Sequence, residues 1–227
     1  SDGSYDQMVR EVGRPRLRML LEQIRSQNLA RFGVVYGYWP VLSQGRELVV
    51  LDPQDTSREV TRFRFPRQVA GRHLCVADFF RDEQEAGELG PDVIAFQLAT
   101  MGPAISDATA ELFKAGSYRE YLELHGLSVQ LTEALAEMWH HRVRTELGLA
   151  GDHEDIAEAI DHQAYRGSRY SFGYAACPNL EDRAKVVGLL HPSRIGVTLS
   201  EEFQLHPEQS TDAFVVHHPE AKYFNAK

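Results

Sequence analysis

The sequence predicts an α+β fold in a single domain over residues 1–227, and three observations about its periodic segments support this. Up to about residue 100, most segments are short runs rich in Val, Ile, Phe and Tyr, which are typical of strands. The middle of the chain changes to longer stretches whose apolar residues recur at helical spacing. The end is mixed, with a short helix followed by further strand-like runs. Strands followed by helices, without regular alternation, indicate α+β rather than α/β.

The strand-rich part begins with one helix and a hairpin. Leucines and an isoleucine at helical spacing predict a helix over 16–29. Two strands, over 32–39 and 48–51, flank a turn that contains Gly45, and this pattern is typical of a β-hairpin. Asp52-Pro53 then stops the second strand.

Three more strands are expected before the helical part. Residues 60–65 place Thr and Phe on one face and Arg on the other, which suits an edge or half-exposed strand. Residues 73–80 and 93–100 are predicted as two further strands. The acidic, glycine-containing segment 81–88 between them is predicted as a loop.

A long helix dominates the middle of the chain. Ser117 and Glu120 have the spacing of a capping box, in which each side chain satisfies a free amide of the other residue at a helix start. The helix is expected to end near Gly148. Its apolar face consists of Leu124, Leu127, Leu131, Leu135 and Met138. The polar residues that fall away from this face are Glu123, Gln130, Glu133, Glu137, His141 and Arg144. A second acidic, helical stretch is expected over 152–164.

The last part of the chain predicts a helix and two strands. Asn179 is expected to cap a helix whose first turn is acidic, as the helix dipole favours. This helix should end before His191-Pro192. Strands are expected over 195–199 and 213–217.

Composition excludes several classes of partner and compartment. The net charge of -9 disfavours a nucleic-acid partner. No apolar run is long enough to span a membrane, and the segment from Ser1 does not resemble a signal peptide. Cys75 and Cys177 are the only cysteines, which argues against a disulfide scaffold and fits a reducing compartment. We therefore expect a cytoplasmic protein without membrane or nucleic-acid partners.

Catalytic and metal-binding motifs are sparse. The sequence has no glycine-rich dinucleotide or phosphate loop, no serine elbow and no His-Glu-x-x-His motif. Adjacent histidines, as in His140-His141 and His217-His218, point in different directions, so we expect surface or capping histidines rather than a metal site. Cys177 precedes a helix start, where a thiol can become nucleophilic, but a packed, inert cysteine is the alternative. We assign no catalytic residue and no metal-binding residue.

The run from Arg166 to Tyr174 is the strongest candidate for a ligand loop. Its glycines let backbone amides approach a ligand, its arginines offer a planar fork to a carboxylate, and its aromatic faces attract a cation. A zwitterion with a positive sulfur would suit all three features. An ordinary exposed turn explains the same residues equally well.

The pattern Arg169-x-x-x-Gly173-Tyr174-x-Ala176-Cys177-Pro178 resembles the S-adenosylmethionine-binding loop of cobalamin-dependent methionine synthases. Other segments resemble the same C-terminal reactivation domain in matching order, so the resemblance covers nearly the whole chain. These segments are 35–40, 77–80, 100–102, 121–126, 131–144, 208–213 and 222–224.

The resemblance implies a C-shaped α+β domain with a twisted antiparallel sheet flanked by helices. It implies that the domain binds S-adenosylmethionine and supports the reductive methylation of cob(II)alamin to methylcobalamin. The whole enzyme would transfer a methyl group from 5-methyltetrahydrofolate to homocysteine to make methionine. Cobalamin would sit on a neighbouring domain, a flavodoxin-like protein would donate the electron, and zinc would be needed only by the full-length enzyme.

The resemblance also implies the residues that contact S-adenosylmethionine. Arg169 would bind the carboxylate, and Glu133 would meet the ammonium or sulfonium charge. The backbone around the loop would cradle the ligand, with Tyr174 toward the cobalamin, and the last strand would add two aromatic contacts. The implied set is Glu133, Arg169, Gly173, Tyr174, Ala175, Ala176, Tyr223 and Phe224.

Two departures from the family pattern leave alternatives open. Ala175 stands where the family usually has proline, and an upstream aspartate of the family has no match. Because the chain starts at Ser1 without Met, we expect it to be the C-terminal piece of a longer enzyme. A free-standing activator of another corrinoid protein and a thiol enzyme that uses Cys177 are the alternatives.

Overall fold

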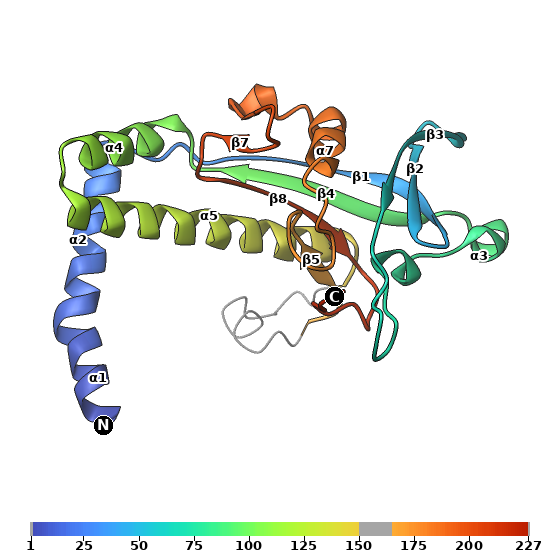
Figure 1. The fold of residues 1–227 in the computed structure, drawn as a ribbon, viewed down its shortest axis with the longest axis horizontal. Coiled ribbons are helices and arrows are strands. Elements are labelled where there is room, and N and C mark those ends of the chain that lie inside the picture. The colour runs from blue at the N-terminus through green and yellow to red at the C-terminus, as the bar shows by residue number, and fades with distance from the viewer. Residues whose placement is uncertain (1, 150–164, 227) are drawn as a thin grey trace.

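The computed structural model describes residues 2–149 and 165–226, and it contains one large antiparallel sheet with helices on both faces (Figure 1). The strand order is β3-β2-β1-β4-β8-β5, and all neighbouring strands are antiparallel. Their bounds are β1 Gly33–Gln44, β2 Glu47–Asp52, β3 Asp55–Arg64, β4 Asp92–Thr100, β5 Ser168–Tyr170 and β8 Ser210–Val216. The α+β prediction is confirmed, and β3 is an edge strand as expected.

The helices and a small second sheet surround this sheet. The α-helices are α1 Asp2–Met8, α2 Arg14–Ser26, α3 Glu83–Leu89, α4 Pro103–Lys114, α5 Tyr118–Glu146 and α7 Asp182–Leu190. Shorter elements are the π-helix η1 Val9–Gly13, the 3-10 helices η2 Val76–Phe79 and η3 Pro192–Ile195, and the paired strands β6 Thr198–Leu199 and β7 Leu205–His206. No helix in the described ranges has the length and apolar character needed to cross a membrane.

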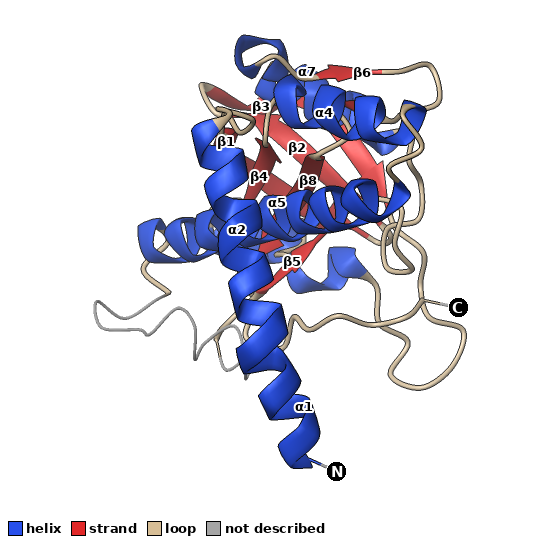
Figure 2. Cartoon of the chain, turned by 90° about the vertical axis from the view of Figure 1, so that its left-hand side faces the viewer, coloured by secondary structure: helices blue, strands red, loops and turns tan. Residues whose placement is uncertain are grey.

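The N-terminal helix extends away from the sheet. Figures 1 and 2 show α1, η1 and α2 as one continuous helix whose far end lies outside the body of the molecule. In Figure 1, the loop after β3 descends on the same side at the opposite end of the sheet, which agrees with the expected C shape.

Strand β4 is buried on both faces, and its sequence shows why. Ile94, Phe96 and Leu98 belong to the main core, where α7 also packs. The alternating residues between them are small or polar, and helix α5 covers that face. Gln97 donates from Nε2 to the carbonyl oxygen of Ala136 at 2.9 Å, which fixes α5 to the sheet. A strand paired on both edges and covered on both faces requires this nearly continuous buried pattern.

The main core is rich in aromatic residues. Phe172 lies 5.3 Å from Phe214 between ring centroids, and Tyr170 stacks on Phe214 at 5.5 Å. Each fully buried aromatic side chain contributes about 1.5–3 kcal/mol of transfer free energy. This core holds β5 and the segment after it against the sheet.

Two predicted segments have a different structure. The strand expected over 73–80 is wrong, because η2 forms there and the Asp78 carboxylate accepts the Cys75 amide at 3.2 Å and binds Arg67. The loop expected over 81–88 is also wrong, because Asp82 and Glu85 form a capping box that starts α3. Helix α4 was not predicted.

Helix α5 begins and ends where predicted, but two details differ. Ser117 is the N-cap residue without any side-chain cap hydrogen bond, so the predicted capping box is wrong. The buried face also turns away from the leucine stripe in the second half of the helix, where Met138 is exposed while His140 and Arg144 are buried. The small Ala136 lets the helix pack closely on the sheet and brings this other face inward.

The structure confirms part of the prediction for the C-terminal helix and strands. Helix α7 ends before His191 as expected but begins at Asp182, and Asn179 accepts only the Glu181 amide at 3.2 Å. The strand expected over 195–199 shortens to β6, whereas the strand expected over 213–217 is confirmed by β8. The helix expected over 152–164 lies outside the described residues.

Candidate ligand site

A pocket of about 260 Å³ lies where β5, α5 and the C-terminal tail meet. It is lined by Glu137, Tyr165, Gly167, Ser168, Arg169, Lys222 and Tyr223. Arg169 was expected in a loop but lies on β5, which pairs with β8 through Arg169 and Val215. Because side chains alternate along a strand, Tyr170 points into the core while Arg169 points toward α5.

Gly167 brings the chain close to β8 at the start of β5. Its φ of +88° lies in the left-handed region that favours glycine. A Cβ atom at this position would stand 2.5 Å from the carbonyl oxygen of Val216. The pocket wall is therefore main chain at this point.

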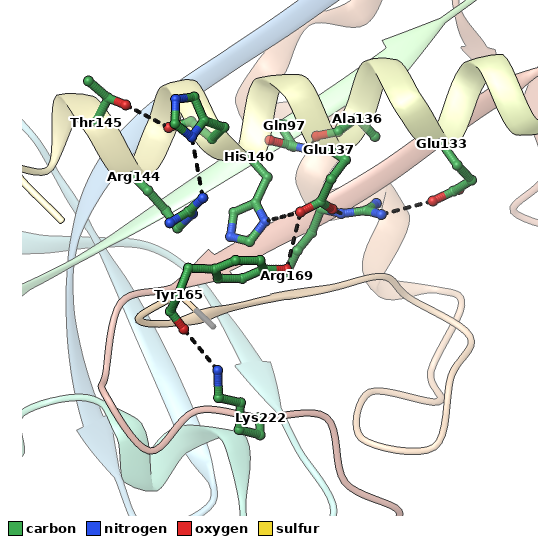
Figure 3. A network of polar contacts seen from close by, with 11 residues as sticks. Gln97, Glu133, Ala136, Glu137, His140, Arg144, Thr145, Tyr165, Arg169 and Lys222 are labelled. Atoms are coloured by element: carbon green, nitrogen blue, oxygen red, sulfur yellow. Dashed lines mark hydrogen bonds and ion pairs between the residues drawn. The ribbon is translucent and has the colours of Figure 1, made fainter. Parts of the chain in front are cut away.

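The Arg169 guanidinium binds two glutamates of helix α5 (Figure 3). Its Nη2 donates to Glu133 Oε2 at 2.8 Å, and its Nε donates to Glu137 Oε2 at 3.3 Å. Its Nη1 is buried and has no hydrogen-bond partner within the described part of the chain. The structure thus brings together Arg169 and Glu133, two of the residues that the family resemblance implied.

Glu137 is held from its other oxygen as well. Tyr165 Oη donates to Glu137 Oε1 at 3.1 Å, and His140 Nδ1 lies 3.1 Å from the same oxygen. Burial alone would raise the pKa of the Glu137 carboxyl, but the hydrogen bond from His140 and the charge of Arg169 lower it to about 2. Burial in turn lowers the pKa of His140. The expectation of a surface histidine is wrong for His140, which is fully buried.

Positive charges surround Tyr165. The Arg144 guanidinium lies 4.1 Å from the centre of the Tyr165 ring. Lys222 Nζ donates to the Tyr165 carbonyl oxygen at 2.8 Å, and the Lys222 carbonyl oxygen accepts Tyr170 Oη at 2.7 Å. These contacts tie the C-terminal tail to β5 and fix one side of the pocket.

The loop after β5 is tight and presents one aromatic side chain. Gly173 has a φ of +93°, and its amide donates to the Cys177 carbonyl oxygen at 3.0 Å. Tyr174 is 60% exposed, Ala175 is half-buried and Ala176 is fully buried. Tyr174 is therefore the member of this loop whose side chain is available to a partner surface.

The two aromatic residues of the tail have different positions. Both follow β8 in an extended tail without strand pairing, so their expected place on a last strand is wrong. Tyr223 lines the pocket and is 59% exposed. The ring of Phe224 is buried beside Phe79 and Tyr170, with centroids 6.2 and 6.3 Å away. The Tyr223 side chain therefore lines the pocket, whereas the ring of Phe224 does not.

Cys177 has the environment of an inert thiol. It is buried, its Sγ donates to the Ser171 carbonyl oxygen at 2.9 Å, and burial raises the pKa of its thiol to about 12. A thiolate is the reactive form of cysteine, so the burial of Cys177 and the raised pKa of its thiol argue against the alternative of a thiol enzyme. Within the ranges 2–149 and 165–226, no group of three or more His, Cys, Asp or Glu residues could hold a metal ion.

Sequence reasoning missed several residues of this site. Glu137 was noted only as a polar residue of the long helix, and Tyr165 was not singled out. Glu133, Glu137, His140 and Arg144 recur every three or four residues, which places them on one helix face. That polar stripe was the available signal.

Three comparisons with known proteins agree on one family. The family described as "Vitamin B12 dependent methionine synthase, activation domain" matches residues 15–227. The chain is 56% identical over 231 residues to a methionine synthase of Mycobacterium tuberculosis and 54% identical to that of Mycobacterium leprae. It aligns over 98% of its own length but spans only 19% of each relative.

A solved structure shares the fold. The crystal structure of the MetH reactivation domain bound to AdoHcy superposes with a TM-score of 0.87, at 22% sequence identity. The superposition covers 98% of this chain and 72% of that one. At this identity the likeness establishes the fold.

Proposed function

The chain belongs to the family of vitamin B12-dependent methionine synthase activation domains, and from this membership we propose that it binds S-adenosylmethionine in the pocket beside Arg169. The domain would thereby support the reductive methylation of cob(II)alamin to methylcobalamin. The longer enzyme would transfer a methyl group from 5-methyltetrahydrofolate to homocysteine. The chain spans only 19% of each relative, and this favours a domain of a longer enzyme over a free-standing corrinoid activator.

The observation that carries the proposal is the pairing of charges in the pocket. Arg169 offers a buried guanidinium nitrogen, Nη1, without a partner among the described residues, and this suits a ligand carboxylate. The Glu133 side chain, which binds Arg169 beside the pocket, is 47% exposed and suits an ammonium or sulfonium group. Both charges of an amino-acid zwitterion therefore find a complement within one site.

The residues of this chain mainly bind and orient. The Gly173 loop has a backbone conformation that favours glycine, so its main chain can lie close to the ligand. Tyr174 projects from the same loop, and we assign it to the side that faces the cobalamin domain. Cobalamin on the neighbouring domain would supply the nucleophile for the methyl group, while the residues of this chain would contribute position and electrostatics.

Partners and surroundings follow from the same proposal. The cobalamin-binding domain of the same enzyme is the first partner, and a flavodoxin-like protein is the electron donor. Zinc would be required by the full-length enzyme and not by this domain. The cytoplasmic location stays a prediction.

Calorimetric titration of S-adenosylmethionine tests the proposal. Arg169→Met should weaken binding by about 1.5–3 kcal/mol, the cost of losing a charged hydrogen bond. Arg166→Met is the matched control, because the exposed Arg166 donates to the His217 carbonyl oxygen and does not line the pocket. An equal loss in both variants would remove Arg169 from the site. No binding, even by a chain extended upstream to include the missing aspartate, would overturn the proposed function.

A further inference from the structure

The two carboxylates that bind Arg169 have different surroundings. The Glu133 side chain is 47% exposed, and Arg169 is its one hydrogen-bond partner among the described residues. The Glu137 side chain is 16% exposed, and both of its oxygens are engaged. An exposed pair is easily exchanged with water or a ligand, whereas a buried and fully bonded carboxylate is not.

We propose that Glu137, held by His140 and Tyr165, is the positioning residue that aims the Arg169 guanidinium at the carboxylate of the ligand, and that the ligand displaces Glu133 from Arg169. This inference rests on the proposed function. It adds Glu137, His140 and Tyr165 to the site as residues that act through Arg169.

The geometry of the guanidinium supports this division of roles. Glu137 occupies Nε, whereas Glu133 occupies Nη2. Once Glu133 is displaced, both Nη2 and the unpartnered Nη1 of Arg169 can donate hydrogen bonds to a ligand. These two nitrogens lie on one edge of the planar guanidinium. That edge binds a carboxylate through two parallel hydrogen bonds. The displaced Glu133, whose side chain is 47% exposed, would then be available to the ammonium group of the same ligand.

His140 and Tyr165 explain why Glu137 stays in place. Displacing Glu137 would leave the buried Nδ1 of His140 and the hydroxyl of Tyr165 without their acceptor. The oxygens of the Glu137 carboxylate can only accept hydrogen bonds, so the His140 Nδ1 that lies 3.1 Å away carries the proton and donates it. The fixed carboxylate then fixes the plane of Arg169.

Titrations with two ligands distinguish a positioning role of Glu137 from a general effect of the substitution on the stability of the fold. S-adenosylmethionine and decarboxylated S-adenosylmethionine share the sulfonium and the amine and differ in the carboxylate. In calorimetric titrations of this chain, Glu137→Gln should weaken binding of the first ligand about tenfold or more. It should change binding of the decarboxylated ligand less than about threefold, because Arg169 does not contact that ligand.

Three further variants serve as controls. Glu146→Gln, on the same helix but bonded to Tyr36 and Tyr38, should affect neither ligand. His140→Leu should act like Glu137→Gln, whereas His140→Asn keeps a donor near the Nδ1 position and should restore discrimination between the ligands. Thermal melts of each variant show whether it is folded.

The outcomes are distinct. An unchanged affinity of Glu137→Gln for S-adenosylmethionine, or an equal loss for both ligands, would overturn the positioning role and leave the proposed function standing. If neither the unmodified chain nor the same chain with its upstream extension bound S-adenosylmethionine, both the positioning role and the proposed function would be overturned.

Discussion

Arg169 lies on β5 and Arg183 lies on α7, on either side of the loop that contains Gly173. Each arginine binds a carboxylate, but the two carboxylates have different surroundings. Arg169 faces the pocket, where Glu137 has hydrogen-bond partners on both oxygens. Arg183 reaches into the core, where its Nε donates to Asp212 Oδ1 at 3.1 Å and its Nη1 to the Phe203 carbonyl oxygen at 3.1 Å. Asp212 Oδ2 is buried with no partner in the described part of the chain.

The pKa values of the two acids show the consequence of this difference. Burial raises the pKa of Asp212 to about 6 and outweighs the charge of Arg183. Hydrogen bonds and Arg169 overcome the burial of Glu137 and lower its pKa to about 2. A buried carboxylate is therefore stable as an anion when its whole hydrogen-bonding capacity is used, and one arginine is not enough.

The largest effect is expected from removing the core arginine. Arg183→Met leaves Asp212 buried without its cation and should lower the free energy of unfolding by about 3–5 kcal/mol. Arg169→Met should cost less than about 2 kcal/mol, because Glu137 keeps two hydrogen-bond donors and Glu133 faces water. Urea denaturation at pH 7 measures both values, and equal losses would contradict the comparison.

A pH series should give a somewhat smaller effect. Because the pKa of Asp212 is raised in the folded state, its contribution to stability is present below pH 4 and is lost as the pH rises through about 6. The unfolding free energy of the natural chain relative to Asp212→Asn should fall by about 2–2.5 kcal/mol between pH 4 and pH 7. Glu137 has the opposite sign, since its stabilisation is lost as the pH falls from 4.5 toward 2. A pH-independent difference between the two chains would mean that Asp212 is an ordinary ion pair.

The smallest effect on the free energy of unfolding is expected from removing one hydrogen-bond donor from the Glu137 carboxylate. Its hydrogen bonding would then be less complete, as it is in Asp212. Tyr165→Phe removes one donor from the Glu137 carboxylate and should cost about 0.5–1.5 kcal/mol at pH 7. The pKa of Glu137 should rise, so the variant should lose stability at a higher pH than the natural chain when acidified. Tyr223→Phe, on the exposed side of the same pocket, is the control and should change stability by less than about 0.5 kcal/mol.

Much of the fold was predictable because its signals are local. The hairpin of β1 and β2, strands β4 and β8 and the extent of α5 follow from periodicity and turn residues. The error over 81–88 was avoidable, since Asp82 and Glu85 carry the capping-box spacing. The structure of residues 73–80 could not be predicted in this way. Asp78 in this segment binds Arg67, which lies outside the segment, so the sequence pattern of 73–80 does not contain that contact.

The candidate site was predictable only in part. Arg169 and Glu133 came from the family resemblance, as did the loop at Gly173. Glu137 contacts Arg169 across 32 residues of sequence, and that contact depends on how α5 packs on the sheet and how β5 pairs with β8. The burial of the Phe224 ring likewise depends on tertiary contacts with Phe79 and Tyr170.

Gly167 limits how this pocket can diversify. Any side chain there would collide with the carbonyl oxygen of Val216, lift β5 from the edge of the sheet and carry Arg169 away from its glutamates. Substitutions on α5 or the tail can retune which molecule is preferred without disturbing that edge. Substitutions can thus change the chemistry of the pocket, whereas the position of the pocket requires a glycine at residue 167.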